Sequence, residues 1–238
     1  MNARMLLCAL AAPAFLTAAA SGQIITQWNF NSNPPDGVLT TGTTAPNIGA
    51  GTISAIGGVT TSFASGNANG GSTDPDTGDN SGWQTTTYPA QGTGSGTAGI
   101  QALVSTVGHS DIIVSWDQRH SNTSSRFWQF QYTLDGETFS SAGLADDGIY
   151  SGNAGDTWFN GRTADLTGIA GAANNANFGF RVVAVFDPAG TGQYLASSAT
   201  GTYGPTGTSR FDMVTVVPAP GALALLGLGC ATALRRRR

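Results

Sequence analysis

The amino-acid sequence predicts an all-β protein built as an antiparallel β-sandwich. Short segments that alternate apolar and polar residues recur along residues 23–216, and turn signals separate them. None of these segments sustains the helical period of 3.6 residues. The composition agrees, because 34 glycines and abundant threonine and serine favour turns and strands. The sequence shows no internal repeat, which argues against solenoids and propellers.

The first strand is predicted over residues 24–30, with Ile24, Thr26, Trp28 and Phe30 on one side. A weaker strand is expected near residues 52–63. The glycine- and aspartate-rich stretch that follows is predicted to form a long and poorly ordered loop.

The strand pattern strengthens after Gly82. Strands are predicted over 82–89, 97–106, 111–121 and 127–134, and Asp135-Gly136 then forms a hairpin turn into a return strand. A strand or turn follows near 157–166, the only helix considered lies near 167–173, and further strands are predicted over 177–187 and 210–217. The tryptophans Trp28, Trp116 and Trp128 fall on the apolar sides of their strands, so we expect them in the core.

Residues 1–22 have the three parts of a secretory signal peptide. Arg4 is the basic part, residues 5–16 are apolar, and small residues follow, so signal peptidase would cut after Ala20 or Gly22. The alternative is a short buried helix of a cytosolic domain. Both cysteines lie in the two terminal segments, which excludes disulfides and cysteine-ligated metals from the body between them.

The last 22 residues, 217–238, also have three parts. A Pro-x-Pro motif precedes the uncharged run 221–234, and four arginines end the chain. Fourteen helical residues rise about 21 Å, short of the roughly 30 Å hydrocarbon core, so a transmembrane helix here would be marginal. The motif and the arginine cluster comprise Val217, Pro218, Ala219, Pro220, Arg235, Arg236, Arg237 and Arg238.

This tail resembles the PEP-CTERM sorting signal of exported bacterial proteins, although Ala219 stands where that family has glutamate. The resemblance implies a membrane-bound intermediate, processing near the motif by an exosortase, and a final location at the cell surface or outside the cell. A plain tail anchor is the alternative. The strings FQYTLDGETF and RFDMVTV are similar to jelly-roll, galactose-binding-like modules, which implies a jelly-roll-like, non-catalytic ectodomain over residues 23–216.

The charge of the body excludes nucleic-acid partners. Without Arg4 and the four terminal arginines, five basic residues face 14 acidic ones, which gives a formal charge near −9. Such a body repels nucleic acid and anionic lipid.

Polar residues of the central strands suggest a carbohydrate-binding face, with exopolysaccharide as its ligand. Planar amides, carboxylates and guanidinium groups suit sugar hydroxyls, and these side chains would project together if their strands share a sheet. The alternative is a solvated sheet face on which Asp117 pairs with Arg181 or Arg119. The candidate residues are Asp117, Arg119, Phe127, Gln129, Gln131 and Arg181.

Two groups of carboxylates are candidates for calcium. Asp74, Asp76 and Asp79 lie close together in the long loop, and hard oxygen ligands at this density suit Ca²⁺. Asp212 in the last strand is a separate candidate. The alternative is a solvated turn.

We do not expect an enzyme, because the sequence contains no GxSxG, HExxH or P-loop motif. The main hypothesis is an exported, non-catalytic surface or matrix protein, and the first alternative is a carbohydrate-binding module. The second alternative is a secreted glycan hydrolase that uses Asp117 and His120. Those two residues are three apart in a strand, so they should point to opposite faces.

Overall fold

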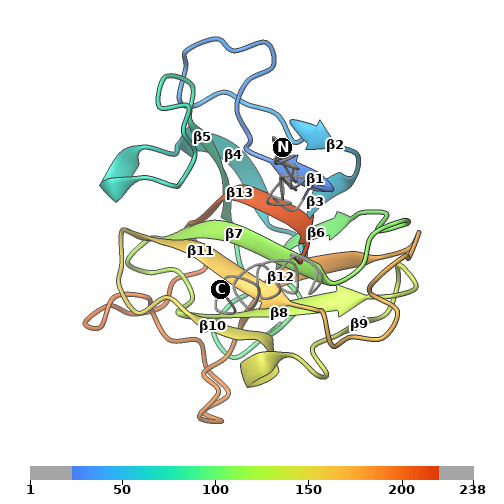
Figure 1. Ribbon diagram of the computed structural model, residues 1–238. Coiled ribbons are helices and arrows are strands. Elements are labelled where there is room, and N and C mark those ends of the chain that lie inside the picture. Colours follow the sequence, from blue (N-terminus) through green and yellow to red (C-terminus); the bar gives the residue numbers. More distant parts are fainter. Residues whose placement is uncertain (1–22, 220–238) are drawn as a thin grey trace, which may run out of the picture. The chain divides into compact units, whose positions relative to one another are not determined.

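The alternating segments form two antiparallel sheets in the computed structural model, which describes residues 23–219 (Figure 1). The seven-stranded sheet has the order β11-β7-β13-β1-β2, with β5 beside β13 and β4 beside β5. Its strands are β1 (Thr26–Trp28), β2 (Ile48–Gly49), β4 (Thr60–Ser65), β5 (Ser81–Thr86), β7 (Ile112–His120), β11 (Thr157–Asp165) and β13 (Ser209–Pro218).

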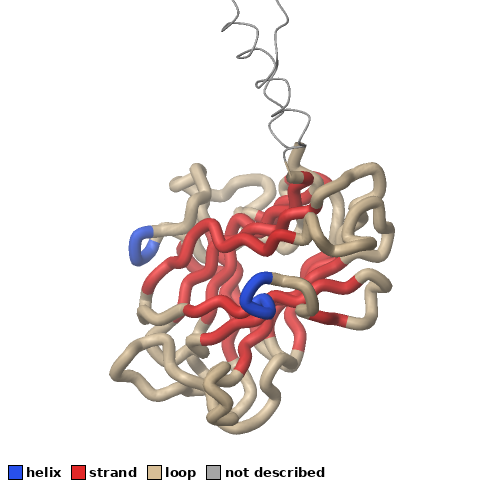
Figure 2. The backbone as a smooth tube through the Cα atoms, turned by 60° about the horizontal axis from the view of Figure 1, so that its bottom comes forward, coloured by secondary structure: helices blue, strands red, loops and turns tan. Residues whose placement is uncertain are grey.

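The six-stranded sheet has the order β10-β8-β12-β6-β3, with β9 beside β8. Its strands are β3 (Thr52–Ile56), β6 (Gly99–Leu103), β8 (Phe127–Thr133), β9 (Phe139–Ser140), β10 (Ile149–Ser151) and β12 (Gly179–Val185). From β10 to β13 the chain changes sheets at every connection, a pattern typical of jelly-roll-like sandwiches. Two short 3-10 helices, η1 (Ala68–Gly70) and η2 (Ala145–Gly148), lie among the loops (Figure 2).

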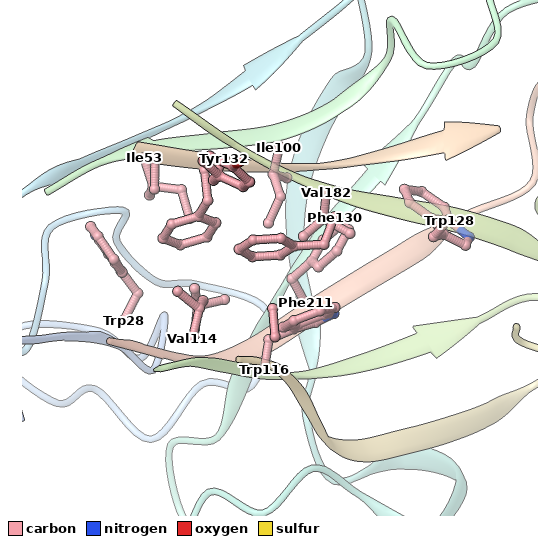
Figure 3. Packing of buried hydrophobic residues seen from close by; sticks show 14 of the residues in the cluster. Trp28, Ile53, Ile100, Val114, Trp116, Trp128, Phe130, Tyr132, Val182 and Phe211 are labelled. Atoms are coloured by element: carbon pink, nitrogen blue, oxygen red, sulfur yellow. The ribbon is translucent and has the colours of Figure 1, made fainter. Parts of the chain in front are cut away.

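The core lies between the two sheets (Figure 3). Trp28, Trp116 and Trp128 are at most 1% exposed, which confirms their predicted place. Trp116 from the seven-stranded sheet stacks on Phe130 from the six-stranded sheet, with ring centres 5.6 Å apart. Each such buried aromatic side chain stabilises the fold by about 1.5–3 kcal/mol. Aromatic contacts between the two sheets therefore stabilise their packing against each other.

Two local predictions are wrong. The segment near 52–63 is not one strand, because Gly57 and Gly58 adopt positive φ angles and turn the chain from β3 in one sheet into β4 in the other. Residues 167–173 form successive turns rather than a helix.

The last strand, β13, contains a β-bulge, and it pairs with a different strand on either side of that bulge. Its first half pairs with β5 and its second half pairs with β1, while β7 runs along its other side. The register shifts between Asp212 and Thr215, and Met213 has a φ of 47°. The Met213 amide donates a hydrogen bond to Asp212 Oδ1 at 2.7 Å, so this carboxyl group supports the bulge.

The last strand of the described residues includes the start of the predicted sorting motif. Val217 and Pro218 are the last residues of β13 and pair with Ile113 and Ile112 of β7. The predicted signal peptide, residues 1–22, and the tail from Pro220 to Arg238 lie outside the described residues. Within residues 23–219 no helix has the length and apolar character needed to cross a membrane.

Candidate functional site

The predicted carbohydrate-binding face is divided between the two sheets. Asp117 and Arg119 lie on β7 of the seven-stranded sheet, whereas Gln129, Gln131 and Arg181 lie on β8 and β12 of the six-stranded sheet. The assumption that all these strands share a sheet is therefore wrong. Alternation fixes which side of a strand a residue occupies, but β7 takes its partners β11 and β13 from distant parts of the sequence.

Asp117 is buried and holds a loop rather than facing solvent. Its Oδ2 accepts hydrogen bonds from the Thr73 amide at 2.6 Å and the Thr73 hydroxyl at 2.7 Å, and its Oδ1 accepts one from the Gly161 amide at 2.7 Å. Thr73 belongs to the segment 66–80, which we call the strap. A second hydrogen bond fixes the strap to β11, because Trp158 Nε1 donates to the Ala68 carbonyl at 2.8 Å. These contacts place the strap over part of the outer face of the seven-stranded sheet.

Arg119 is used within the protein as well. Its Nη2 lies 2.6 Å from Asp156 Oδ1, and this is the only ion pair among the described residues. Arg119 is 9% exposed and lies beside Arg210 in the register of β7 and β13. Neither Asp117 nor Arg119 is presented to a ligand in the way the sequence suggested.

The outer face of the six-stranded sheet brings the other predicted residues together. Four polar side chains lie in register on the adjacent strands β8, β12, β6 and β3, and we call them the polar row. Gln101 and Ser54 were not predicted as site residues. The alternation of Gln101 with Ile100 and Ala102 indicates its face, but its position beside Arg181 depends on the register. The polar row consists of Gln131, Arg181, Gln101 and Ser54.

A chain of hydrogen bonds orients this row. Arg181 Nε donates to Gln131 Oε1 at 2.5 Å, and Gln131 Nε2 donates to Gln129 Oε1 at 2.7 Å. Gln129 Nε2 in turn donates to the Asp147 carbonyl at 3.0 Å and to the Ser141 hydroxyl at 3.2 Å. Because each amide has its acceptor and its donor engaged, the guanidinium group is held in one orientation.

An aromatic ring completes the row, although not the ring that was predicted. The Arg181 guanidinium carbon lies 4.5 Å from the centre of the Phe139 ring, and β9 places that ring beside Thr133 of β8. Phe127 lies on the same face at the other end of β8, four residues from Gln131. The hairpin turn at Asp135-Gly136 is the sequence signal that could have placed Phe139 here.

Asp117 and His120 point to opposite faces of β7, as predicted. His120 is fully buried between Trp128 and Phe159, with ring centres 5.8 and 5.3 Å away, and its Nε2 lies 3.1 Å from Arg162 Nη2. Burial, together with the charges of Arg162 and Arg119, lowers the pKa of His120 well below 6.5. The structure does not bring these two residues together as an acid–base pair.

The predicted calcium ligands are engaged in the fold. Asp79 accepts the amides of Ser32 and Gly37 at 3.1 and 2.9 Å, and Asp74 accepts the Asp76 amide and the Asn31 side chain at 2.8 and 2.9 Å. Across residues 23–219 no three carboxylate, histidine or cysteine side chains are arranged to hold a metal ion. The structure therefore does not assemble the calcium site expected from Asp74, Asp76 and Asp79.

Asp212 stands apart from those three carboxylates. It is fully buried, and its Oδ2 has no hydrogen-bond partner among the described residues. Burial raises the pKa of Asp212 well above 3.8, and the nearby charges of Asp74 and Asp117 act in the same direction. The side chain therefore favours the neutral acid far more than an exposed aspartate does.

Comparisons with protein-family models and with curated proteins find no match. Among solved structures, the CBM22-1 xylan-binding domain of Paenibacillus barcinonensis Xyn10C has a TM-score of 0.44 and 13% identity, over 86% of this chain and 100% of that domain. The CBM22-1-CBM22-2 tandem of the same protein gives the same score and identity, and this chain covers 48% of its length.

The K1 cleaved adhesin domain of Lys-gingipain from Porphyromonas gingivalis W83 has a TM-score of 0.35 and 10% identity, over 71% of this chain and 99% of that domain. Similarities at these scores carry no argument about function. The β-sandwich follows from the strand pairing of this chain.

Proposed function

We propose that this chain is an exported, non-catalytic surface protein that binds polysaccharide on the outer face of its six-stranded sheet. The observation that carries the proposal is the polar row with its fixed hydrogen-bond chain and the Phe139 ring beside it. Sugar hydroxyls both donate and accept hydrogen bonds, and amides and guanidinium groups in a row can satisfy several of them. Because Gln131 and Arg181 are already held by hydrogen bonds, binding a sugar immobilises fewer side chains and costs less conformational entropy.

The opposite outer face also carries polar side chains in register, but its two arginines are buried and already engaged. These side chains are Ser62, Gln84, Arg210 and Arg119, on β4, β5, β13 and β7. There the strap covers Asp117, and Arg119 is paired with Asp156. We therefore place the polysaccharide on β8, β12, β6 and β3.

A glycan array probed with the full chain tests this proposal. Replacing Gln131 and Arg181 together by alanine removes two of the four side chains of the row. We therefore expect the affinity for a glycan that the wild type binds on the array to fall at least about tenfold. Gln193→Ala changes an exposed amide outside the row and should bind like the wild type. Unchanged binding by the double variant would overturn the placement.

The cellular location of the protein is a separate proposal. We infer that signal peptidase removes residues 1–22 and that an exosortase cuts the tail near its Pro-x-Pro motif, which leaves the sandwich at the cell surface or in the extracellular matrix. Because β13 pairs through Pro218, the cut should fall after that residue, where the chain leaves the sheet. Mass spectrometry of the protein from its native host should find a C-terminus between Pro218 and Gly221. An intact Arg238 would contradict processing.

A further inference from the structure

We propose that Arg181 binds the carboxylate of an acidic sugar, so that the ligand of the polar row is a polysaccharide containing uronic acids. This inference rests on the proposed function and adds the chemical class of the ligand. It follows from the free terminal nitrogens of this arginine and from its place on the polar row.

Three of the other four arginines in the described part of the chain have their terminal nitrogens engaged inside the protein. Arg119 forms the ion pair with Asp156, and Arg162 is buried against Gln118 and His120. Arg210 is also buried and donates from both terminal nitrogens, to the Ser65 carbonyl and to Gln84. The fourth, Arg126, donates only its Nε, to the Ala196 carbonyl, but it precedes β8 and lies outside the polar row.

Arg181 keeps its two terminal nitrogens free. Only its Nε makes a hydrogen bond among residues 23–219, and the acceptor is the neutral amide of Gln131. Partial burial lowers the pKa of Arg181, and no carboxylate contributes to this shift. A half-buried cation is thus left without an internal counter-charge. It attracts an anion at short range although the body as a whole is acidic, because salt screens charges more than about 10 Å away.

The free edge of this guanidinium group has the geometry of an anion site. Gln131 holds Nε and the Phe139 ring lies 4.5 Å from the guanidinium carbon, so Nη1 and Nη2 form a fixed fork. Such a fork donates two parallel hydrogen bonds to a planar carboxylate, which a hydroxyl group cannot accept in the same way.

The neighbouring side chains suit the rest of a sugar residue. Gln101 lies directly beside Arg181 in the register, and Ser54 lies beside Gln101. Adjacent strands are about 4.8 Å apart, a spacing that lets these groups reach hydroxyls of the same or the next sugar. Their side chains make no hydrogen bonds within the described residues, so they too are available to a ligand.

The test compares acidic polymers with neutral forms of the same polymers. The full chain is titrated with polygalacturonate, alginate and hyaluronate, and with each polymer after chemical reduction of its carboxyl groups. We expect at least one native polymer to bind at least about tenfold more tightly than its reduced form. Arg181→Gln should abolish this preference, whereas the matched control Arg126→Gln should keep it. Circular dichroism and thermal melting of each variant establish that it is folded.

The outcomes separate this inference from the proposed function. Equal binding of native and reduced polymers, or a preference that survives in Arg181→Gln, overturns the acidic ligand while the carbohydrate-binding face stands. If only neutral glycans bind on the array, the acidic ligand is likewise overturned and the carbohydrate-binding face stands. If neither the acidic polymers nor the array glycans bind, both proposals fail.

Discussion

At the scale of single residues, two fully buried titratable side chains make stability depend on pH in opposite directions. His120 and Asp212 are both fully buried, and each favours its neutral form because ionisation inside the protein loses hydration. For His120 the unfolded chain binds more protons below its ordinary pKa, so stability is lost as the pH falls. For Asp212 the folded chain binds more protons above pH 3.8, so stability is lost as the pH rises.

The variant Asp212→Asn should stabilise the protein at pH 7. Asparagine keeps the acceptor for the Met213 amide and replaces the unpartnered Oδ2 by an NH₂ group near Asp74 and Asp117. We expect a gain of about 1 kcal/mol or more in the free energy of unfolding at pH 7, and a smaller gain at pH 4. Urea unfolding at both pH values measures it. A loss of stability in the variant, with wild type stabilised by added Ca²⁺, would show an ionised carboxylate at a metal site.

The variant His120→Gln should be less sensitive to acid than the wild type. Glutamine retains an acceptor for Arg162 but gives up the packing on Trp128 and Phe159, so the variant is less stable at pH 7. Below pH 6.5 the wild type alone loses stability as the pH falls, by at most about 1.4 kcal/mol per pH unit, so the difference should narrow between pH 7 and pH 5. Urea unfolding at pH 7 and pH 5 checks this. A constant difference would mean that His120 is charged in the folded protein.

At the scale of elements, the strap shows how a polar loop becomes part of the fold. Its sequence predicts disorder because it is rich in glycine, aspartate and asparagine. Its anchors, however, come from β7 and β11, which are more than 40 residues away in sequence. Buried hydrogen bonds to a carboxylate contribute more than bonds between neutral groups, which explains how Asp117 orders this segment.

Replacing Asp117 by alanine should therefore destabilise the protein strongly. Two backbone amides and one hydroxyl lose their acceptor, which should cost about 3 kcal/mol in the free energy of unfolding. The control Glu137→Ala removes an exposed carboxylate and should change little. Chemical unfolding gives both values, and an Asp117→Ala variant as stable as the control would contradict the role of the strap anchor.

The sequence predicts the faces of the strands well and their partners poorly. Alternation places Trp116 inward and Asp117 outward on β7, and Trp128 inward and Gln129 outward on β8. It cannot show that β7 and β8 belong to different sheets, because that choice depends on pairing with distant strands such as β13. Of the predicted carbohydrate-binding residues, the outer face of the six-stranded sheet carries four and the other sheet carries Asp117 and Arg119. The four are Phe127, Gln129, Gln131 and Arg181. Gln101, Ser54 and Phe139 join them only through the register.

At the scale of the whole molecule, the two sheets present different outer faces. The seven-stranded sheet carries the strap, whereas the six-stranded sheet presents the polar row. The last strand, β13, ends at Pro218, inside the predicted sorting motif.

The most direct test of the carbohydrate-binding face is the affinity of Gln101→Ala for the polysaccharide that the wild type binds. Gln101 makes no side-chain hydrogen bond within the described residues, so its truncation should leave the melting temperature unchanged. We predict affinity at least about fivefold weaker by isothermal titration calorimetry of the full chain, with Gln193→Ala unchanged. If Gln101→Ala binds as tightly as the wild type, polysaccharide does not lie on the polar row.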